Sequence, residues 1–328
     1  MPIQWLEHSA ASNGGTETMG RALERHLPAD LLAECQIFPS RVSGDLDETK
    51  IRILWCHDMA EDPMNDHLAG GGWRRFHKLV FVSNWQMQRF IDRHGVPWSR
   101  CCVLQNAIEP MRETAAGWSE GQKVRFVYTP TPHRGLNVLF GAFSKLYEED
   151  QDVELNVYSS FALYGWGDRD SQFAGLMGAM GEHPGVTMHG TVPNDQLRRD
   201  LLGQHVFAYP STWPETSCLC LLEAMSAGLM CVHSNLGALS ETAANWTCMY
   251  QFQEEPNRHA SVLLECMRMA ASRVRAGNTP EVGQKAYTDL FYNWSFRAQE
   301  WAGLITSLLQ EDRAIETVTD HFVYRSHP

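Results

Sequence analysis

The sequence contains no run of about 18 apolar residues, so it offers no segment that would span a membrane. Its first residues, MPIQWLEHSAASNGG, lack the basic stretch followed by an apolar stretch that a secretory signal has. The nine cysteines are scattered and show no zinc-finger spacing. These absences predict a reduced, cytoplasmic protein without a membrane span or a structural metal.

Positive charge is also scarce, and the net charge is −12. This charge argues against a general nucleic-acid binder. Residues 1–116 carry 12 Lys and Arg against 15 Asp and Glu, a net of −3, whereas the remainder carries 15 against 24, a net of −9. The first part therefore leaves room for an anionic partner. Its run WRRFHK offers Arg74, Arg75 and Lys78 for this purpose, although such runs more often form the solvated face of a helix.

What the sequence does contain is an ordinary globular composition, 44% hydrophobic and 20% charged over 328 residues, enough for about two domains. Short apolar runs alternate with helix-like segments, which predicts α/β units around parallel sheets. Strands are predicted at residues 51–56, 79–83, 102–105, 124–128, 154–158, 186–189, 206–209 and 230–233. Helices are predicted from the capping box at Ser83 to Gly95, at 136–149, 195–203 and 218–227, and in the final stretch SFRAQEWAGLITSLL.

The polar, glycine-containing stretch 113–123 lies between the strands of the two predicted sheets. We therefore predict a linker there, with one domain in residues 1–116 and a second in residues 117–295. Residues 296–328 hold the final amphipathic helix and a polar tail.

The segment PETSCLCLLEAMSAG raises a specific question about two carboxylates. Its helix is apolar almost all round, which predicts a place in the core. Glu223 nevertheless lies in the middle of this helix, and Glu215 stands just before it. An unpaired buried carboxylate costs several kcal/mol. Each glutamate is therefore either paired with Arg or Lys inside the protein or placed to bind hydroxyl groups of a ligand.

Two loops have the composition of anion sites. The turn Asn13-Gly14-Gly15-Thr16 leads into a helix and could bind an anion. A tight turn without a ligand is an equally good interpretation. The loop TPTPHRG places Arg134 before a helix with the Thr129 hydroxyl nearby. A guanidinium fork matches phosphate, and the alternative is an exposed loop arginine.

His57 follows the predicted strand ILWC. A lone histidine there is more often a structural hydrogen bonder, but ligands gather at the carboxyl ends of parallel strands, which favours a functional role here.

Taken in order along the chain, these segments resemble the nucleotide-sugar glycosyltransferases of the GT-B fold, specifically glycosyltransferase family 4. The strongest element is Glu215, seven residues, Glu223 and then AMSAG. The Gly14-Gly15 loop, VSNWQ, QNAI, HRGLNVLFGAF and MHGTVPNDQL add to it. The resemblance implies an α/β architecture of two Rossmann-like domains facing across a cleft, an acceptor domain followed by a donor domain. It also implies that the C-terminal helix packs back on the N-terminal domain.

The resemblance also implies roles for individual residues. Glu223 would accept hydrogen bonds from the ribose of the donor, Glu215 would meet hydroxyls of the transferred sugar, and His57 would lie near that sugar. Arg134 and the helix start would face the diphosphate. The implied donor-binding set is completed by Gly14, Gly15, Thr129, Gly190, Ser217, Cys218 and Leu219, and the acceptor-side candidates are Asn13, Thr16, Arg74, Arg75 and Lys78.

The implied activity is that of a retaining hexosyltransferase that needs no metal or other cofactor. UDP is the favoured nucleotide, with UDP-glucose as the working donor. The acceptor hydroxyl is open: a glycan, a lipid-linked sugar, a protein, a small molecule, or a hydroxymethylated base in DNA, which the net charge disfavours.

One departure from the family pattern concerns the phosphate-binding cations. Thr129 and Arg134 stand where the family often has an arginine and, five residues later, a lysine. This departure favours a degenerate, non-catalytic nucleotide-binding module, and a nucleotide-sugar epimerase on the same scaffold is a second alternative that stays open.

Overall fold

A computed structural model describes residues 2–5, 12, 14–42, 45–278 and 282–311. The chain divides into two compact units, the first formed by Met1–Ala107 and Tyr292–Pro328 and the second by Ile108–Phe291. Within the described residues, no helix has both the length and the apolar character needed to cross a bilayer.

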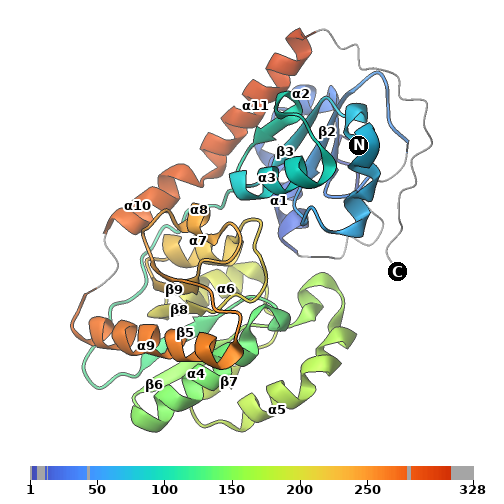
Figure 1. The fold of residues 1–328 in the computed structure, drawn as a ribbon. Coiled ribbons are helices and arrows are strands. Elements are labelled where there is room, and N and C mark those ends of the chain that lie inside the picture. Colours follow the sequence, from blue (N-terminus) through green and yellow to red (C-terminus); the bar gives the residue numbers. More distant parts are fainter. Residues whose placement is uncertain (1, 6–11, 13, 43–44, 279–281, 312–328) are drawn as a thin grey trace. The chain divides into compact units, whose positions relative to one another are not determined.

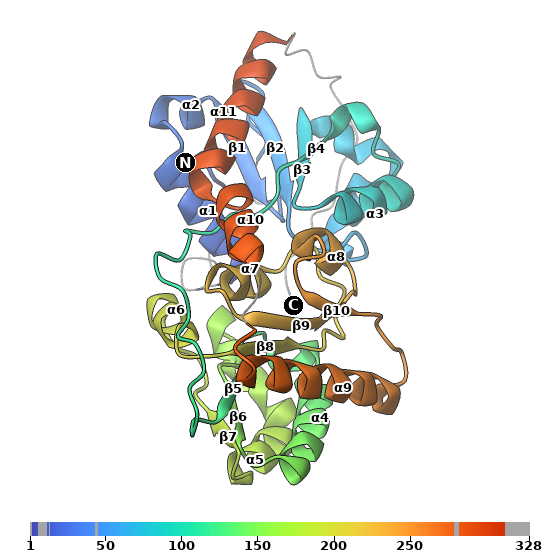
Figure 2. The ribbon, with the colours of Figure 1, turned by 90° about the vertical axis from the view of Figure 1, so that its left-hand side faces the viewer.

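The first unit contains a parallel sheet of four strands in the order β1-β2-β3-β4. Helices α1 and α11 lie on one side of this sheet and α3 on the other (Figure 2), and α11 packs against α1, α2 and β2. The elements are β1 (Cys35–Pro39), β2 (Ile51–Cys56), β3 (Lys78–Phe81), β4 (Cys101–Val103), α1 (Gly15–His26), α2 (Ala29–Ala33), η2 (Pro63–Arg75), α3 (Asn84–His94), η3 (Trp98–Arg100) and α11 (Trp294–Gln310).

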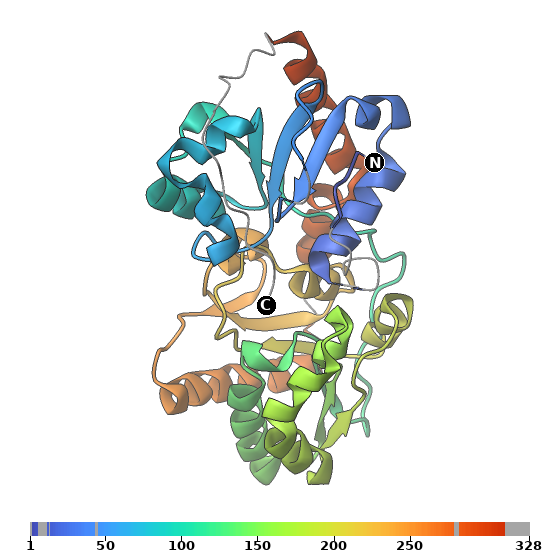
Figure 3. The same ribbon diagram turned by 90° about the vertical axis from the view of Figure 1, so that its right-hand side faces the viewer.

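The second unit contains a parallel sheet of six strands in the order β10-β9-β8-β5-β6-β7. Helices α4 and α9 pack against each other (Figures 1 and 3), and α7 packs on β9, α8 and α10. The elements are β5 (Val124–Tyr128), η4 (Pro132–Arg134), α4 (Leu136–Glu149), β6 (Val153–Val157), η5 (Phe161–Tyr164), η6 (Gly167–Phe173), α5 (Ala174–Glu182), β7 (Val186–Met188), α6 (Asn194–Leu201), β8 (Val206–Tyr209), α7 (Leu219–Ser226), β9 (Met230–Ser234), α8 (Leu239–Ala243), β10 (Cys248–Tyr250), α9 (Pro256–Arg275) and α10 (Val282–Phe291).

The predicted α/β architecture with two parallel sheets is confirmed, and all eight predicted strands are present to within two residues at each end. Continuous burial along β2, β8 and β9 explains their clear signal, since parallel strands covered on both faces are apolar throughout. The structure adds two strands that the sequence analysis missed. In β1 the polar Gln36 and the terminal Pro39 obscure the pattern, and β10 has only three residues.

Local capping fixes the ends of α3 as predicted. The Ser83 hydroxyl accepts a hydrogen bond from the Gln86 amide at 3.1 Å, and Gly95 adopts the left-handed conformation that ends the helix.

The unit boundary differs from the predicted linker. It falls after residue 107, and the polar stretch 113–123 belongs to the second unit. The amides of Ala115 and Ala116 donate to the carbonyl oxygens of Ala227 and Leu202 at 2.7 and 2.9 Å. These backbone bonds fasten the stretch to the second unit, which its polar composition did not reveal. The other boundary lies at 291/292 rather than 295/296.

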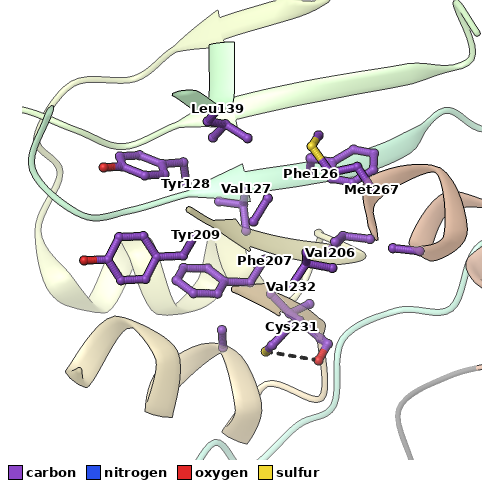
Figure 4. Packing of buried hydrophobic residues seen from close by; sticks show 14 of the residues in the cluster. Phe126, Val127, Tyr128, Leu139, Val206, Phe207, Tyr209, Cys231, Val232 and Met267 are labelled. Atoms are coloured by element: carbon purple, nitrogen blue, oxygen red, sulfur yellow. Dashed lines mark hydrogen bonds between the residues drawn. The ribbon is translucent and has the colours of Figure 1, made fainter. Parts of the chain in front are cut away.

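The core of the second unit ends in two tyrosines at one edge of the sheet. Tyr128 and Tyr209 close β5 and β8, and their rings meet edge to face with centroids 6.1 Å apart. Both hydroxyls point to the same side, beyond the apolar side chains of the core (Figure 4). The fold thus carries two polar groups to the carboxyl ends of neighbouring strands, where ligands of parallel sheets gather.

A glycine allows the loops after these two strands to meet. Gly135 has φ +110°, and a Cβ there would overlap the Pro210 carbonyl oxygen and come within 3.1 Å of its carbon. The Thr212 amide also donates to the Arg134 carbonyl at 3.4 Å. The loop from β5 to α4 and the loop from β8 to α7 are therefore in direct backbone contact.

We predict that Gly135→Ala lowers the free energy of unfolding by at least about 2 kcal/mol. The cost of a positive φ for alanine adds to the cost of the overlap between its Cβ and Pro210. Urea denaturation measures this. Gly141→Ala in α4 is the matched control, since no atom lies within 4 Å of its added Cβ. It should be neutral or stabilise by up to about 1 kcal/mol. Equal effects of the two changes would show that the close approach of the loops is not needed.

Candidate donor site in the second unit

Glu215 is the most buried carboxylate of this site, with a side chain only 6% exposed. Its Oε1 accepts hydrogen bonds from Arg134 Nη1 and from the Tyr209 hydroxyl. Its backbone is held as well, because Ala238 N donates to its carbonyl oxygen at 2.7 Å and Gly237 forms a parallel bridge with it. The structure thus brings together the two residues, Glu215 and Arg134, that the sequence analysis placed at the sugar and the diphosphate.

Only one oxygen of Glu215 is used in this way. Among the described residues no donor lies within hydrogen-bond distance of Oε2, and this atom is not among the fully enclosed polar atoms without a partner. Oε2 therefore has no protein donor among these residues and is not fully enclosed.

The charges in this cluster reinforce one another. Burial alone would favour neutral Arg134, but the neighbouring Glu215 carboxylate outweighs it and holds the pKa of Arg134 well above its ordinary value. Burial, with Glu215 adding to it, raises the pKa of Tyr209 well above 10. Arg134 therefore stays charged and Tyr209 stays a neutral donor at any working pH.

Glu223 repeats this arrangement in α7. Its side chain is 12% exposed, and its Oε1 accepts hydrogen bonds from Arg198 Nη1 and Asn194 Nδ2, both at 3.2 Å. Its Oε2 has no donor among the described residues either. Burial raises the pKa of Glu223, and Arg198 partly opposes this. Both glutamates are therefore paired inside the protein, one of the two alternatives left open by the sequence, yet one oxygen of each has no donor among the described residues.

The remaining predicted donor-site residues surround the start of α7. Leu219 opens the helix and Cys218 caps it, without a side-chain hydrogen bond to the first turn. The Thr129 hydroxyl is buried and bonds to the Cys220 thiol, and hydrogen bonds from the Cys218 thiol and Thr129 lower the pKa of Cys220. Thr129 thus supports the helix start. The backbone amides at the start of α7 keep no capping side chain, which suits an anion.

Gly190 has φ +67° and lies in the loop between β7 and α6, four residues before Asn194. This loop leads to Asn194, the first residue of α6, whose side chain donates to Glu223. The backbone of Ser217 directly precedes the cap of α7.

In the first unit, His57 lies at the carboxyl end of β2. Its amide donates to the Ser40 hydroxyl at 3.1 Å, and its ring lies 4.6 Å from that of Trp55. Ser40 has φ +65°, an uncommon conformation for this residue. Burial lowers the pKa of His57 to about 3, so its ring is neutral at working pH.

The glycine turn before α1 falls partly inside the described residues. Gly14 is the N-cap of α1, its amide donates to the Ser12 hydroxyl at 3.2 Å, and Gly15 and Thr16 begin the helix. The predicted Asn13 lies outside the described residues.

The basic run in η2 and β3 is less accessible than the sequence suggested. Arg75 is buried and donates to the carbonyl oxygens of Gly72 and His67, both at 2.9 Å. Lys78 Nζ donates to the Ser99 carbonyl at 2.7 Å, and the Arg74 guanidinium lies over the Trp73 ring at 4.7 Å. The prediction of a solvated face does not hold for Arg75. Its guanidinium is buried because carbonyl oxygens inside the fold accept its N–H groups.

Three residues of this site were missed by the sequence analysis: Tyr209, Asn194 and Arg198. The spacing of Asn194 and Arg198, four residues apart on a helix, was the one available signal. Within the described part of the chain, no three His, Cys, Asp or Glu side chains gather as metal ligands.

Comparison with known proteins now decides the family. The model of the family described as "Glycosyl transferases group 1" matches residues 116–312. The chain belongs to this family. As a group 1 glycosyl transferase it carries both glutamates and Arg134 inside the matched range. The search of curated protein sequences found no significant match to this chain.

Solved structures support the same GT-B fold. A glycosyltransferase from Rickettsia africae ESF-5 is similar with a TM-score of 0.64 and 11% identity, over 92% of this chain and 84% of that one. WaaG, a glycosyltransferase involved in lipopolysaccharide biosynthesis, has a TM-score of 0.61 and 17% identity, over 88% of this chain and 80% of that one. Anabaena Alr3699/HepE in complex with UDP-glucose has a TM-score of 0.58 and 17% identity, over 79% of this chain and 73% of that one.

We predict that Tyr209→Phe destabilises the group 1 transferase by about 1.5–3 kcal/mol, because it removes a hydrogen bond to a buried carboxylate. Tyr128→Phe is the matched control, since Tyr128 is equally buried but donates to the neutral Thr131 carbonyl at 3.0 Å. It should cost about 0.5–1.5 kcal/mol. Urea unfolding of both variants measures the difference, which should shrink when Glu215→Gln is added. An equal loss in the two single variants would contradict the proposed strength of the Tyr209–Glu215 bond.

His57 gives a pH dependence of stability. Its pKa is about 3 in the folded chain and near 6.5 when unfolded, so the unfolded state binds the extra proton between these values. Stability therefore falls as the pH is lowered from 6.5 toward 3. Between pH 7.5 and 5, the wild type should lose about 2 kcal/mol more than His57→Gln, as measured by denaturant unfolding at each pH. Parallel pH curves would show that the ring is accessible to protons in the folded state.

Proposed function

We propose that this protein is a retaining family 4 glycosyltransferase that moves a hexose from a nucleoside diphosphate sugar, UDP-glucose in the first instance, to a hydroxyl acceptor. The observation that carries this is the paired arrangement of Glu215 and Glu223. Each carboxylate has one oxygen held by protein donors and the other open. Hydroxyl groups of a ribose and a sugar are the donors that such half-satisfied carboxylates fit.

In this proposal Glu223 accepts from the ribose and Glu215 from the transferred sugar. Fixing Oε1 of each carboxylate orients Oε2 before the ligand arrives, which limits the entropy lost on binding.

Charge on the leaving diphosphate is balanced by Arg134 and by the first turn of α7. The bond between the anomeric carbon and the diphosphate oxygen breaks through an oxocarbenium-like state, and a bond to the acceptor oxygen forms on the same face. The acceptor's proton passes to the leaving diphosphate oxygen. Fixed positive groups that meet growing negative charge supply the main stabilisation. We propose that they replace a metal ion here.

The choice of UDP rests on similarity to the HepE structure with UDP-glucose. The nine cysteines are free thiols, which supports the proposed reducing, cytoplasmic setting. For the acceptor, Thr16 and the start of α1 remain the candidates in the first unit. The burial of Arg75 weakens the motive for a DNA base.

Two variants test the donor site. Glu215→Gln should lower kcat about 100-fold while the protein stays folded, because the transition-state contact weakens. Glu223→Ala should raise the donor KM about tenfold or more, with a smaller effect on kcat, because a ribose contact is lost. Nucleotide release from UDP-, GDP-, ADP- and dTDP-sugars is the measurement.

Glu265→Gln is the matched control, since this glutamate of α9 is 71% exposed. It should leave both constants unchanged. An unaltered donor KM for Glu223→Ala would remove the ribose assignment. If no donor is hydrolysed and none raises the melting temperature, the transferase proposal fails in favour of a binding module.

A further inference from the structure

Trp213 is a large apolar side chain that the fold leaves in water beside the candidate donor site. It is 43% exposed and lies two residues before Glu215, in the loop between β8 and α7. The guanidinium carbon of Arg134 lies 6.0 Å from the centre of its ring. An exposed tryptophan next to converging polar groups is typical of a binding surface.

This exposure does not come from a loose loop. The Ser211 hydroxyl donates to the Trp213 carbonyl at 2.7 Å, and Pro214 restricts the backbone of Trp213 to extended conformations. The Thr212 hydroxyl donates to the His133 carbonyl at 3.3 Å, which ties this loop to the one after β5. The backbone that carries the ring is therefore fixed before any ligand binds.

The ring itself also has a fixed neighbour. The His133 ring meets it nearly perpendicularly, at 80° with centroids 5.2 Å apart. His133 is in turn stacked on Phe161, at 17° and 5.2 Å. Burial lowers the pKa of His133 to about 4, so this support stays uncharged. Trp213 is thus buttressed by His133 while 43% of its surface stays exposed.

We propose that the Trp213 ring is the platform on which the transferred hexopyranose of the donor lies. This inference rests on the proposed donor function and adds a residue that fixes sugar specificity. A pyranose carries hydroxyl groups around its rim and C–H bonds on its faces. The negative face of an aromatic ring attracts such C–H groups, while Glu215 Oε2 accepts from a hydroxyl at the rim. Trp213 and Glu215 would thereby recognise two different parts of one sugar.

A purely structural role predicts something else. If Trp213 only shields the ion pair of Arg134 and Glu215, any apolar side chain of similar size should replace it. Its loss should then weaken binding of the nucleotide alone as much as binding of the nucleotide sugar. A platform instead requires an aromatic face and affects the nucleotide sugar alone.

The experiment is calorimetric titration of UDP and of UDP-glucose into the wild type, Trp213→Leu and Trp213→Phe. If the nucleotide-release measurement identifies a GDP-, ADP- or dTDP-sugar as the donor, that nucleotide and its sugar replace UDP and UDP-glucose. Trp213→Leu should weaken UDP-glucose binding about tenfold and leave UDP binding within about twofold. Trp213→Phe should restore most of the loss. Trp98→Leu is the matched control, because Trp98 is also an exposed tryptophan, at 64%. It lies just before β4 and so at the amino end of that strand, away from the carboxyl ends where ligands gather.

The outcomes separate the two proposals. If the wild type binds a nucleotide sugar and Trp213→Leu binds it equally well, the platform is overturned and the donor function stands. Equal weakening for nucleotide and nucleotide sugar also overturns the platform in favour of the shielding role. If the wild type binds neither ligand of any pair, the donor function fails and the platform fails with it.

Discussion

The buried ion pair between Glu215 and Arg134 is the contact on which the arrangement of the candidate site depends. It joins two loops that are 81 residues apart in the sequence. Dehydrating both charges costs several kcal/mol, which their attraction offsets only when the geometry is good and further hydrogen bonds are present. Tyr209 supplies such a bond, and the contact of Gly135 with Pro210 brings the loops close enough. The rest of the loop conformation follows from keeping this carboxylate satisfied.

The same ion pair reconciles two roles that first look incompatible. Arg134 was expected at the diphosphate, yet it binds Glu215. A guanidinium has five N–H donors, and within the described residues only Nη1 of Arg134 is bonded to an acceptor. The other donors remain for phosphate oxygens. Under the proposed function, one arginine would therefore contact both Glu215 and the leaving group, which lessens the need for a second cation at Thr129.

Sequence reasoning reached the fold because parallel strands and capped helices leave local signals. A few adjacent residues are enough to indicate a strand at ILWC, a helix start at Ser83 and a helix at LNVLFGAF. It also singled out Glu215 and Glu223, since a carboxylate inside an apolar helix or just before it is a local contradiction. It missed their partners because pairing is not local. Tyr209 ends a predicted strand and Arg198 lies in a predicted helix, and neither position by itself indicates a glutamate elsewhere in the chain. The compact units divide the chain elsewhere than the predicted linker for a similar reason, since the amides of Ala115 and Ala116 donate to carbonyl oxygens far along the chain.

The half-satisfied state of the two glutamates connects stability with function. A buried carboxylate with both oxygens bonded inside the protein would have nothing left for a ligand, and one with neither bonded would be too costly to keep. Fixing one oxygen with a cation and a neutral donor meets both demands, for Glu215 through Arg134 and Tyr209 and for Glu223 through Arg198 and Asn194. Because two carboxylates at one helix share this pattern, a structural accident at a single residue does not explain it. Under the proposed function, the second oxygen of each carboxylate would accept hydroxyl groups from a polyhydroxylated ligand.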